Sequence, residues 1–358
     1  MSKTIRGTMV LSLDLELSWG WCDKLPIGKI EAQSIEERKQ VKRLLALLDH
    51  YDIPATWAMV GHLMLESCVR DRNGRAHSDL YPQPNYSWFP NNWYYFDPCT
   101  NASSAPGWYA PDVVGWIQRA RARHEIGSHS FGHIYYGDPE CSSPIAEADL
   151  RAALEAAAQK GIALKSFVFP RNQVGHLEVL KHSGLRAYRG AEPPFIYSSN
   201  GALMKAIHFL DQLFALRPRP VRAEETLPGL WNVPGNHSYI PRYGLRKVIP
   251  MASRVLKGKR GIDQAVRTGG LYHLWFHPFN LNVDSYAMLS GLDEIFSHAN
   301  SMREKGLLDI LTMGEYAERL EKEKRRVLRF QRGENSVGTD ELRRRILAQV
   351  QELTRDPS

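Results

Sequence analysis

The sequence predicts an α/β protein whose strands are mostly parallel and form either a barrel or a doubly wound sheet. Short apolar runs alternate with segments of helical periodicity, which is the pattern of repeated strand–helix units. The chain has 358 residues, enough for one barrel of about 250 residues with additions. Ionisable residues follow several apolar runs, and catalytic groups in parallel barrels gather at the carboxyl ends of strands.

The predicted elements alternate along most of the first 190 residues. The apolar run TMVLSLDLEL is followed by a segment with helical periodicity and then by the compact run ATWAMVGHL, which indicates strand, helix, strand. We expect strands at 8–17, 55–63, 124–129, 164–170, 185–190 and 271–280, and helices at 34–53, 111–123, 145–162 and 176–184.

Two segments do not fit this alternation. Residues 70–111 are dense in Trp, Tyr, Pro and Asn, which predicts an insertion whose aromatics either stack on sugar rings or pack against the barrel. Residues 316–358 are charged and helical in pattern, so we expect a C-terminal extension of a catalytic domain at 1–315. Its basic surplus could attract an anionic membrane, but the interleaved glutamates favour a solvated helix, and no nucleic-acid partner is expected.

Several classes of protein are disfavoured by what the sequence lacks. No G-x-G-x-x-G or P-loop pattern follows a predicted strand, which argues against dinucleotide or ATP binding. The four cysteines, Cys22, Cys68, Cys99 and Cys141, form no C-x-x-C pair, so we expect reduced thiols and neither a disulfide framework nor a structural zinc site. No apolar run has the length of a signal peptide or a membrane span, and we therefore expect a cytoplasmic location.

Carboxylates and histidines at the predicted strand ends indicate a metal site. Asp14 and Glu16 alternate in LSLDLEL and so share one face of a strand, where buried carboxylates need a cation, a hydrogen-bond network or a catalytic purpose. The stretch HEIGSHSFGH contains His129 and His133, whose spacing could place both rings on one side of a helical turn, facing one divalent ion. His277 follows the last predicted strand.

Four stretches, taken in order, resemble the motifs of a known family. They are the acidic pair after the first strand, HEIGSHSFGH, FVFPRN and WFHPFN. Together they resemble the polysaccharide deacetylase family with the NodB-homology domain, similar to carbohydrate esterase family 4, over about residues 8–315. The resemblance implies a distorted (β/α) barrel with an aromatic-rich insertion and a helical C-terminal appendage.

The resemblance also implies roles for the metal-site residues. Asp14 would be the general base, Glu16, His129 and His133 the metal ligands, and His277 the general acid. The family usually has two adjacent aspartates where this chain has Asp-Leu-Glu, so the base and ligand roles of the two acids are left open to exchange.

The remaining candidate residues come from the other motifs and from the insertion. Arg171 is the best match to the family's arginine that orients the base, and Asn172 is a candidate hydrogen-bond partner of the substrate. Trp231 is expected as a pocket wall and Asn236 or His237 as a polar contact, while Trp93 is expected to stack on the sugar.

The function that the resemblance implies is metal-dependent N-deacetylation of a sugar. Zinc is the expected ion, because imidazole and carboxylate ligands suit it. The expected substrate is an N-acylated sugar that is nucleotide-linked, lipid-linked or part of an oligosaccharide, as in precursors of a bacterial surface polysaccharide such as O-antigen. The alternatives are an N-deformylase or another C–N amide hydrolase on the same scaffold, and a non-catalytic carbohydrate-binding protein.

Overall fold

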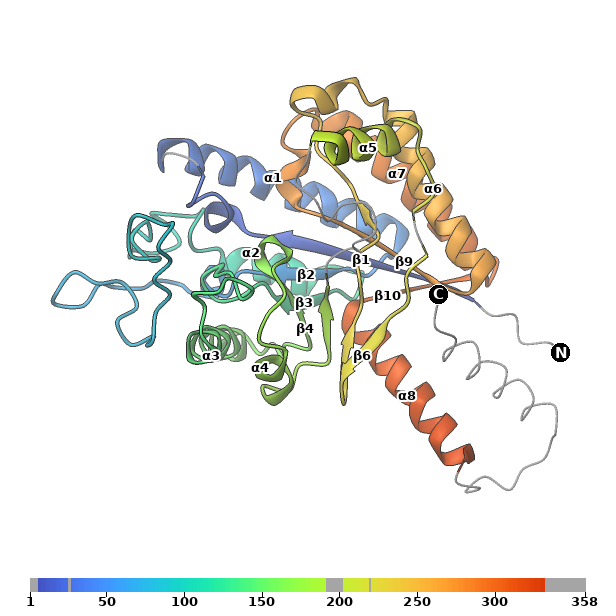
Figure 1. Ribbon diagram of the computed structural model, residues 1–358. Coiled ribbons are helices and arrows are strands. Elements are labelled where there is room, and N and C mark those ends of the chain that lie inside the picture. The colour runs from blue at the N-terminus through green and yellow to red at the C-terminus, as the bar shows by residue number, and fades with distance from the viewer. Residues whose placement is uncertain (1–5, 25–26, 191–201, 219, 332–358) are drawn as a thin grey trace.

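A curled ten-stranded sheet forms the centre of the computed structural model, which describes residues 6–24, 27–190, 202–218 and 220–331. Helices cover the sheet, which curls into a half-barrel (Figure 1), and this confirms the predicted distorted barrel. The strands are β1 Gly7–Leu15, β2 Thr56–Met59, β3 Glu125–Ser128, β4 Ser166–Val168, β5 Ala187–Arg189, β6 Glu224–Leu227, β7 Leu230–Asn232, β8 His237–Ser238, β9 Leu271–Phe276 and β10 Leu308–Leu311.

Strand β1 pairs with three other strands, β2, β9 and β10. Nine strands follow the order β6-β7-β5-β4-β3-β2-β1-β9-β8, and β10 also pairs with β1. The amino-terminal half of β1 pairs with β10 and its carboxyl-terminal half with β2, while β9 pairs along its other side. Among the named strands of the described residues, only β6 and β7 pair antiparallel. The carboxyl ends of β1, β2, β3, β4, β5 and β9 therefore lie at the same end of the barrel.

The helices agree with the predicted ones in order but differ at their ends. The helix expected at 34–53 begins seven residues earlier, at Ile27. Two long helices and strand β10 in the last third of the chain were not predicted. The helices are α1 Ile27–Tyr51, α2 Pro111–Arg119, α3 Ser143–Gln159, α4 Leu177–His182, α5 Ala202–Leu213, α6 Met251–Thr268, α7 Ser285–Glu304 and α8 Met313–Gln331.

The alternation along β1 separates the hydrophobic core from the polar interior of the barrel. Leu11, Leu13 and Leu15 belong to the main apolar cluster. Val10 faces the opposite way, into a smaller cluster that also contains Met313 of α8. Successive side chains of a strand point to opposite faces, so Ser12, Asp14 and then Glu16 continue the Val10 face. The interior is thus apolar where β1 begins and polar where it ends.

The predicted insertion is a long irregular segment. Residues 65–110, all of which the structure describes, contain neither a helix nor a strand, only turns and isolated bridges such as Ser67 with Asn101. Figure 1 shows these loops extending from the end of the sheet toward which β1 runs. The insertion therefore lies at the end of the barrel where the strand-end side chains meet.

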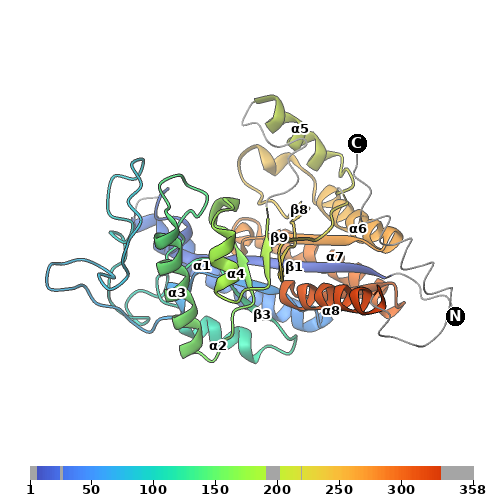
Figure 2. The same cartoon turned by 60° about the horizontal axis from the view of Figure 1, so that its bottom comes forward.

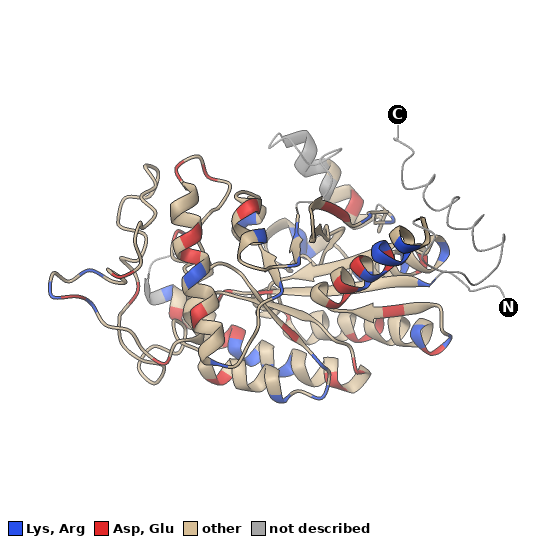
Figure 3. Ribbon diagram, turned by 90° about the horizontal axis from the view of Figure 1, so that it is seen from below, with Lys and Arg blue, Asp and Glu red and all other residues tan. Residues whose placement is uncertain are grey.

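The C-terminal helix lies at the other end of the molecule, away from the insertion (Figures 1 and 2). The predicted domain boundary at 315 falls in the first turn of α8, where Met313, Tyr316 and Ala317 are buried. Farther along, Arg319 pairs with Glu323 and Arg325 with Glu321. Figure 3 shows acidic and basic positions interspersed along the helices. The rest of the extension, 332–358, lies outside the described residues. No described helix is long and apolar enough to cross a membrane.

Candidate active site

Glu16, His129 and His133 form a buried cluster of ligand-type atoms at the carboxyl end of the barrel. The Nε2 atoms of both histidines lie 3.0 Å from the same oxygen, Oε1 of Glu16. Each of the three side chains is at most 6% exposed. Two imidazoles and one carboxylate facing a common point are the donor set of a catalytic divalent-metal site, which keeps a coordination position open.

The protonation pattern of His129 fits a metal ligand. Its Nδ1 lies 2.8 Å from the carbonyl oxygen of Val168, which can only accept, so Nδ1 carries the proton and donates it. Nε2 of the neutral ring then carries a lone pair, which points toward Glu16. This partner fixes the tautomer in the way that backbone carbonyls do for many metal-bound histidines. His133 Nδ1 is buried and has no hydrogen-bond partner.

The loop that holds the two histidines is not helical, which corrects the helical-turn argument for their spacing. Strand β3 ends at Ser128, and Ser130 and His133 have positive φ angles of 66° and 59°. Asp149 of α3 is fully buried and accepts hydrogen bonds from Ser130 Oγ and from the backbone N–H groups of Phe131 and Gly132. One carboxylate thus shapes the turn that directs both rings to Glu16.

Two glycines allow the close packing around this cluster. A Cβ at Gly20 would lie 1.9 Å from Glu16 Oε2, and a Cβ at Gly132 would lie 2.5 Å from the Tyr94 ring. Neither position has room for a side chain.

Asp14 is held by Arg189, a residue that the sequence analysis did not single out. The guanidinium donates from Nη1 to Oδ1 at 2.7 Å and from Nη2 to Oδ2 at 2.6 Å. Burial raises the pKa of Asp14, but the positive charge of Arg189 outweighs it, and the pKa is lowered from its usual value. Asp14 is therefore an ionised carboxylate with a fixed orientation.

A hydrogen-bond chain below this ion pair fixes Arg189. Arg189 Nη1 donates to Ser12 Oγ at 3.0 Å, and Ser12 Oγ lies 2.8 Å from Nε2 of His273. His273 Nδ1 donates to the Val233 carbonyl oxygen at 3.1 Å. Burial lowers the pKa of His273 to about 3, so the neutral ring accepts the proton of Ser12.

Arg171 does not occupy the expected place. Its guanidinium bonds to Asp23 at 2.7 and 2.8 Å and to the Tyr135 hydroxyl at 3.1 Å, so the contact to Asp14 predicted for Arg171 is made by Arg189. The signal that could have identified Arg189 was its place near the carboxyl end of the strand predicted at 185–190, at the same barrel end as Asp14. Asn172 does reach the site, because its Oδ1 accepts from Arg189 Nη2 at 3.3 Å.

His277 completes the cluster from the opposite side. It follows β9, and its Nε2 lies 3.2 Å from Glu16 Oε1 and 3.6 Å from Asp14 Oδ2. Burial opposes the charged form, but the two carboxylates prevail and raise the pKa of His277. Its side chain is 23% exposed, against 3% for Asp14 and 6% for Glu16. His277 is thus more exposed than either carboxylate of the cluster.

Three expected substrate contacts lie elsewhere. Trp93 is 1% exposed and donates from Nε1 to the Gly132 carbonyl oxygen, so it is core packing beneath the histidine loop. His237 is 2% exposed and bonded to the Tyr272 hydroxyl. Trp231 packs against the small apolar cluster near α8, at the other end of the barrel. The structure does not bring these three residues to the cluster, because a sequence pattern does not show how deeply an aromatic or a histidine is buried.

Other aromatic side chains lie beside the cluster. Trp88 of the insertion is 46% exposed as a residue. Its ring stacks on that of Tyr135, with the ring centroids 5.4 Å apart and the ring planes 7° apart. Tyr135 in turn lies 5.9 Å from the ring of His133. On the opposite side Phe279 lies 4.5 Å from the ring of His277 and 4.6 Å from that of Trp21.

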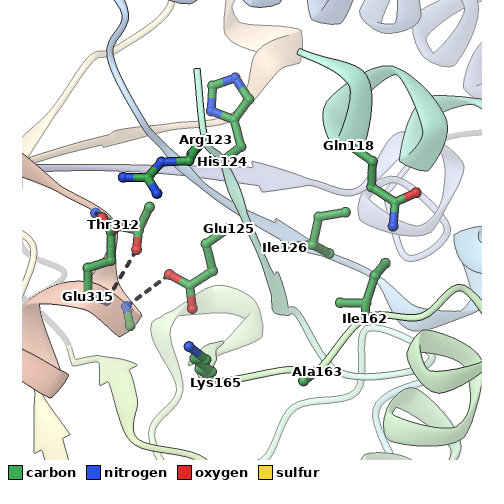
Figure 4. Close-up of a pocket in the computed structure, with 11 residues that line it drawn as sticks. Gln118, Arg123, His124, Glu125, Ile126, Ile162, Ala163, Lys165, Thr312 and Glu315 are labelled. Atoms are coloured by element: carbon green, nitrogen blue, oxygen red, sulfur yellow. Dashed lines mark hydrogen bonds between the residues drawn. The ribbon is translucent and has the colours of Figure 1, made fainter. Parts of the chain in front are cut away.

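A pocket at the other end of β3 is not part of this site (Figure 4). It is lined by Glu125, the first residue of β3, whereas His129 follows the last. Glu125 there accepts hydrogen bonds from Thr56 and from the backbone of Gly314, and so anchors α8 to the barrel.

The fold matches solved structures of polysaccharide deacetylases. A putative polysaccharide deacetylase from Mycobacterium smegmatis has a TM-score of 0.57 and 14% identity, over 90% of this chain and 93% of that one. A probable polysaccharide deacetylase from Pseudomonas aeruginosa PAO1 has a TM-score of 0.54 and 12% identity, over 88% and 91%. The PuuE allantoinase also has a TM-score of 0.54 and 12% identity, over 89% and 91%. No family model matches the sequence, and no curated protein matches it. The chain therefore has the NodB-like polysaccharide deacetylase fold.

Proposed function

We propose that this protein is a metal-dependent hydrolase of non-peptide C–N bonds, and that its substrate is the acetamide of an N-acetylated sugar. The observation that carries the proposal is the convergence of Glu16, His129 and His133 on one point, with Asp14 and His277 beside them. A purely carbohydrate-binding protein would need none of these ionisable groups together in one buried site.

The geometry favours one assignment of the two acids. Glu16 contacts both histidines, which supports it as the ligand, whereas Asp14 contacts Arg189 and supports the role of base. A divalent ion held by Glu16, His129 and His133 would polarise the amide carbonyl and lower the pKa of a bound water. Zinc suits this donor set.

The protein's own groups would then move the protons of the hydrolysis. Asp14, oriented by Arg189, takes a proton from the attacking water. His277, whose pKa is raised by the adjacent carboxylates, donates a proton to the leaving nitrogen as the C–N bond breaks. The products are acetate and a free amine.

The neighbouring aromatics support a ring-shaped substrate. Trp88 is exposed at the insertion side and Phe279 borders His277, so an acetamide in the site would have flat apolar surfaces next to it. We propose a nucleotide-linked or lipid-linked precursor of a surface polysaccharide as the natural acceptor.

A second candidate is supported by the allantoinase match, whose TM-score equals that of the Pseudomonas deacetylase. The same groups could hydrolyse a formamide or a cyclic amide. The deciding experiment incubates the purified protein with N-acetyl and N-formyl sugars, free and carrier-linked, and with allantoin. We expect acetate from at least one sugar; ring opening of allantoin without acetate release would favour the second candidate.

A further inference from the structure

A second cluster of ligand-type side chains lies between the barrel and the insertion. His62 follows β2, whereas Cys68, His77 and Asp97 all belong to the insertion. The four ligand atoms lie within 4.8 Å of one another. His62 and Asp97 are fully buried as side chains, and His77 is 8% exposed.

The other three side chains surround one carboxylate oxygen of Asp97. Asp97 Oδ2 lies 2.9 Å from His62 Nε2, 2.7 Å from His77 Nε2 and 3.3 Å from Cys68 Sγ. The other oxygen of Asp97 is already occupied, because Oδ1 accepts from the Tyr109 hydroxyl at 2.9 Å and from the Cys99 N–H at 3.0 Å. Asp97 is therefore held in place through Oδ1, and its Oδ2 faces the other three side chains of the cluster.

Only one of the two ring nitrogens of His62 has a hydrogen-bond partner. Its Nδ1 lies 3.1 Å from the Trp108 carbonyl oxygen, so Nδ1 carries the proton and Nε2 of the neutral ring is a lone pair. Nε2 is buried and makes no hydrogen bond, although a carboxylate oxygen lies 2.9 Å away. Two lone pairs facing each other at this distance repel, and a cation between them removes the repulsion.

The arrangement repeats that of the first cluster. In both, a histidine donates Nδ1–H to a backbone carbonyl and directs Nε2 at a carboxylate oxygen that a second histidine shares. The difference is the fourth ligand, a thiol. Four protein ligands close a site, and thiolate with imidazole suits zinc.

We propose that His62, Cys68, His77 and Asp97 bind a structural zinc ion that fastens the insertion to the barrel. Zinc bonds of about 2.0–2.3 Å need ligand atoms slightly farther apart than those seen here, which small side-chain rotations supply. Binding to the thiol releases its proton and leaves a zinc thiolate.

The proposed ion explains how a long irregular segment is held in place. The backbone hydrogen bonds of the insertion belong to scattered turns and isolated bridges and not to a helix or a sheet, and a metal can supply folding free energy directly. The rings of His62 and His77 each lie 5.5 Å from Phe131, which stands between His129 and His133 in the chain. The second centre thereby also supports the loop of the first.

The thiol makes the two sites distinguishable by spectroscopy. The protein is stripped of metal under reducing conditions and reloaded with Co²⁺, which gives a thiolate-to-cobalt charge-transfer band in the near ultraviolet only where a cysteine is a ligand. We expect this band in the parent protein and in His133→Ala, and its loss in Cys68→Ala. Elemental analysis should find about two ions per chain in the parent and about one in each variant.

The matched control is Cys141→Ser, which removes another buried free thiol outside the cluster. It should keep both ions and the band. The proposal is overturned if the cobalt-loaded parent lacks the thiolate band, or if Cys68→Ala holds as much metal as the parent. The parent spectrum decides the question even if Cys68→Ala does not fold.

Discussion

Arg189 and Asp14 form a two-pronged ion pair inside the barrel, with side chains that are 1% and 3% exposed. Removing one partner of such a buried pair leaves an uncompensated charge, which costs on the order of 3–5 kcal/mol. We therefore expect Arg189→Ala to lower the free energy of unfolding by about this amount, measured by urea denaturation at pH 7. Turnover should fall as well, because the Asp14 carboxylate loses its fixed orientation.

The matched control is Arg171→Ala, which removes a guanidinium from a more exposed pair with Asp23. Its stability cost should be about 1 kcal/mol or less. Equal losses in the two variants would show that the Arg189–Asp14 pair has no special part in the site.

The two acids should respond differently to amidation. Asp14→Asn should keep the catalytic metal and lose on the order of 100-fold or more in turnover, the usual scale for a general base. Glu16→Gln should lose the ion. Elemental analysis measures the bound metal, and initial rates measure turnover. Circular dichroism checks that each variant is folded. Loss of the catalytic ion in Asp14→Asn would instead show that the two acids have exchanged roles.

Asp149 should be required for metal affinity although it touches no ligand atom. Asp149→Ala leaves the N–H groups of Phe131 and Gly132 without their acceptor, at a cost of about 1–3 kcal/mol for each buried group. We expect metal affinity to fall by about 10–100-fold, as for other groups that orient ligands. Competition with a chelator measures this. Glu147→Ala, an exposed position on the same helix, is the control and should change nothing.

The insertion should contribute its aromatics in two different ways. Trp88→Ala removes an exposed stacked ring and should raise KM for a sugar substrate more than it lowers kcat, since stacking affects substrate and transition state alike. Trp93→Ala removes a buried ring and should cost about 3–5 kcal/mol of stability. An unchanged KM in Trp88→Ala would show that the insertion does not line the substrate cleft.

The sequence predicted the part of the site that strand periodicity determines. Asp14 and Glu16 share a face because side chains alternate along a strand, and His129 and His277 lie together because parallel strands end at one edge. Arg189 was missed because the motif comparison favoured Arg171, although the place of Arg189 near the end of a predicted strand was a signal for it.

The second cluster shows a different reason for a miss. Its candidate ligands come from four separate segments at unequal spacings, and no short pattern such as C-x-x-C connects them. We expected no structural zinc site from the cysteine spacing, and the proposal for Cys68 departs from that expectation. Strand β10 was likewise missed, because its pairing with β1 joins segments about 300 residues apart.

Metal dependence of amide hydrolysis tests the central claim most directly. The measurement is acetate release from the best N-acetylated sugar by protein that has been chelated and then reloaded with zinc, beside Glu16→Gln treated in the same way. We predict background release after chelation, recovery on reloading, and neither recovery nor a bound ion at the catalytic site in Glu16→Gln. Full acetate release by the metal-free protein, or by Glu16→Gln, would contradict the account.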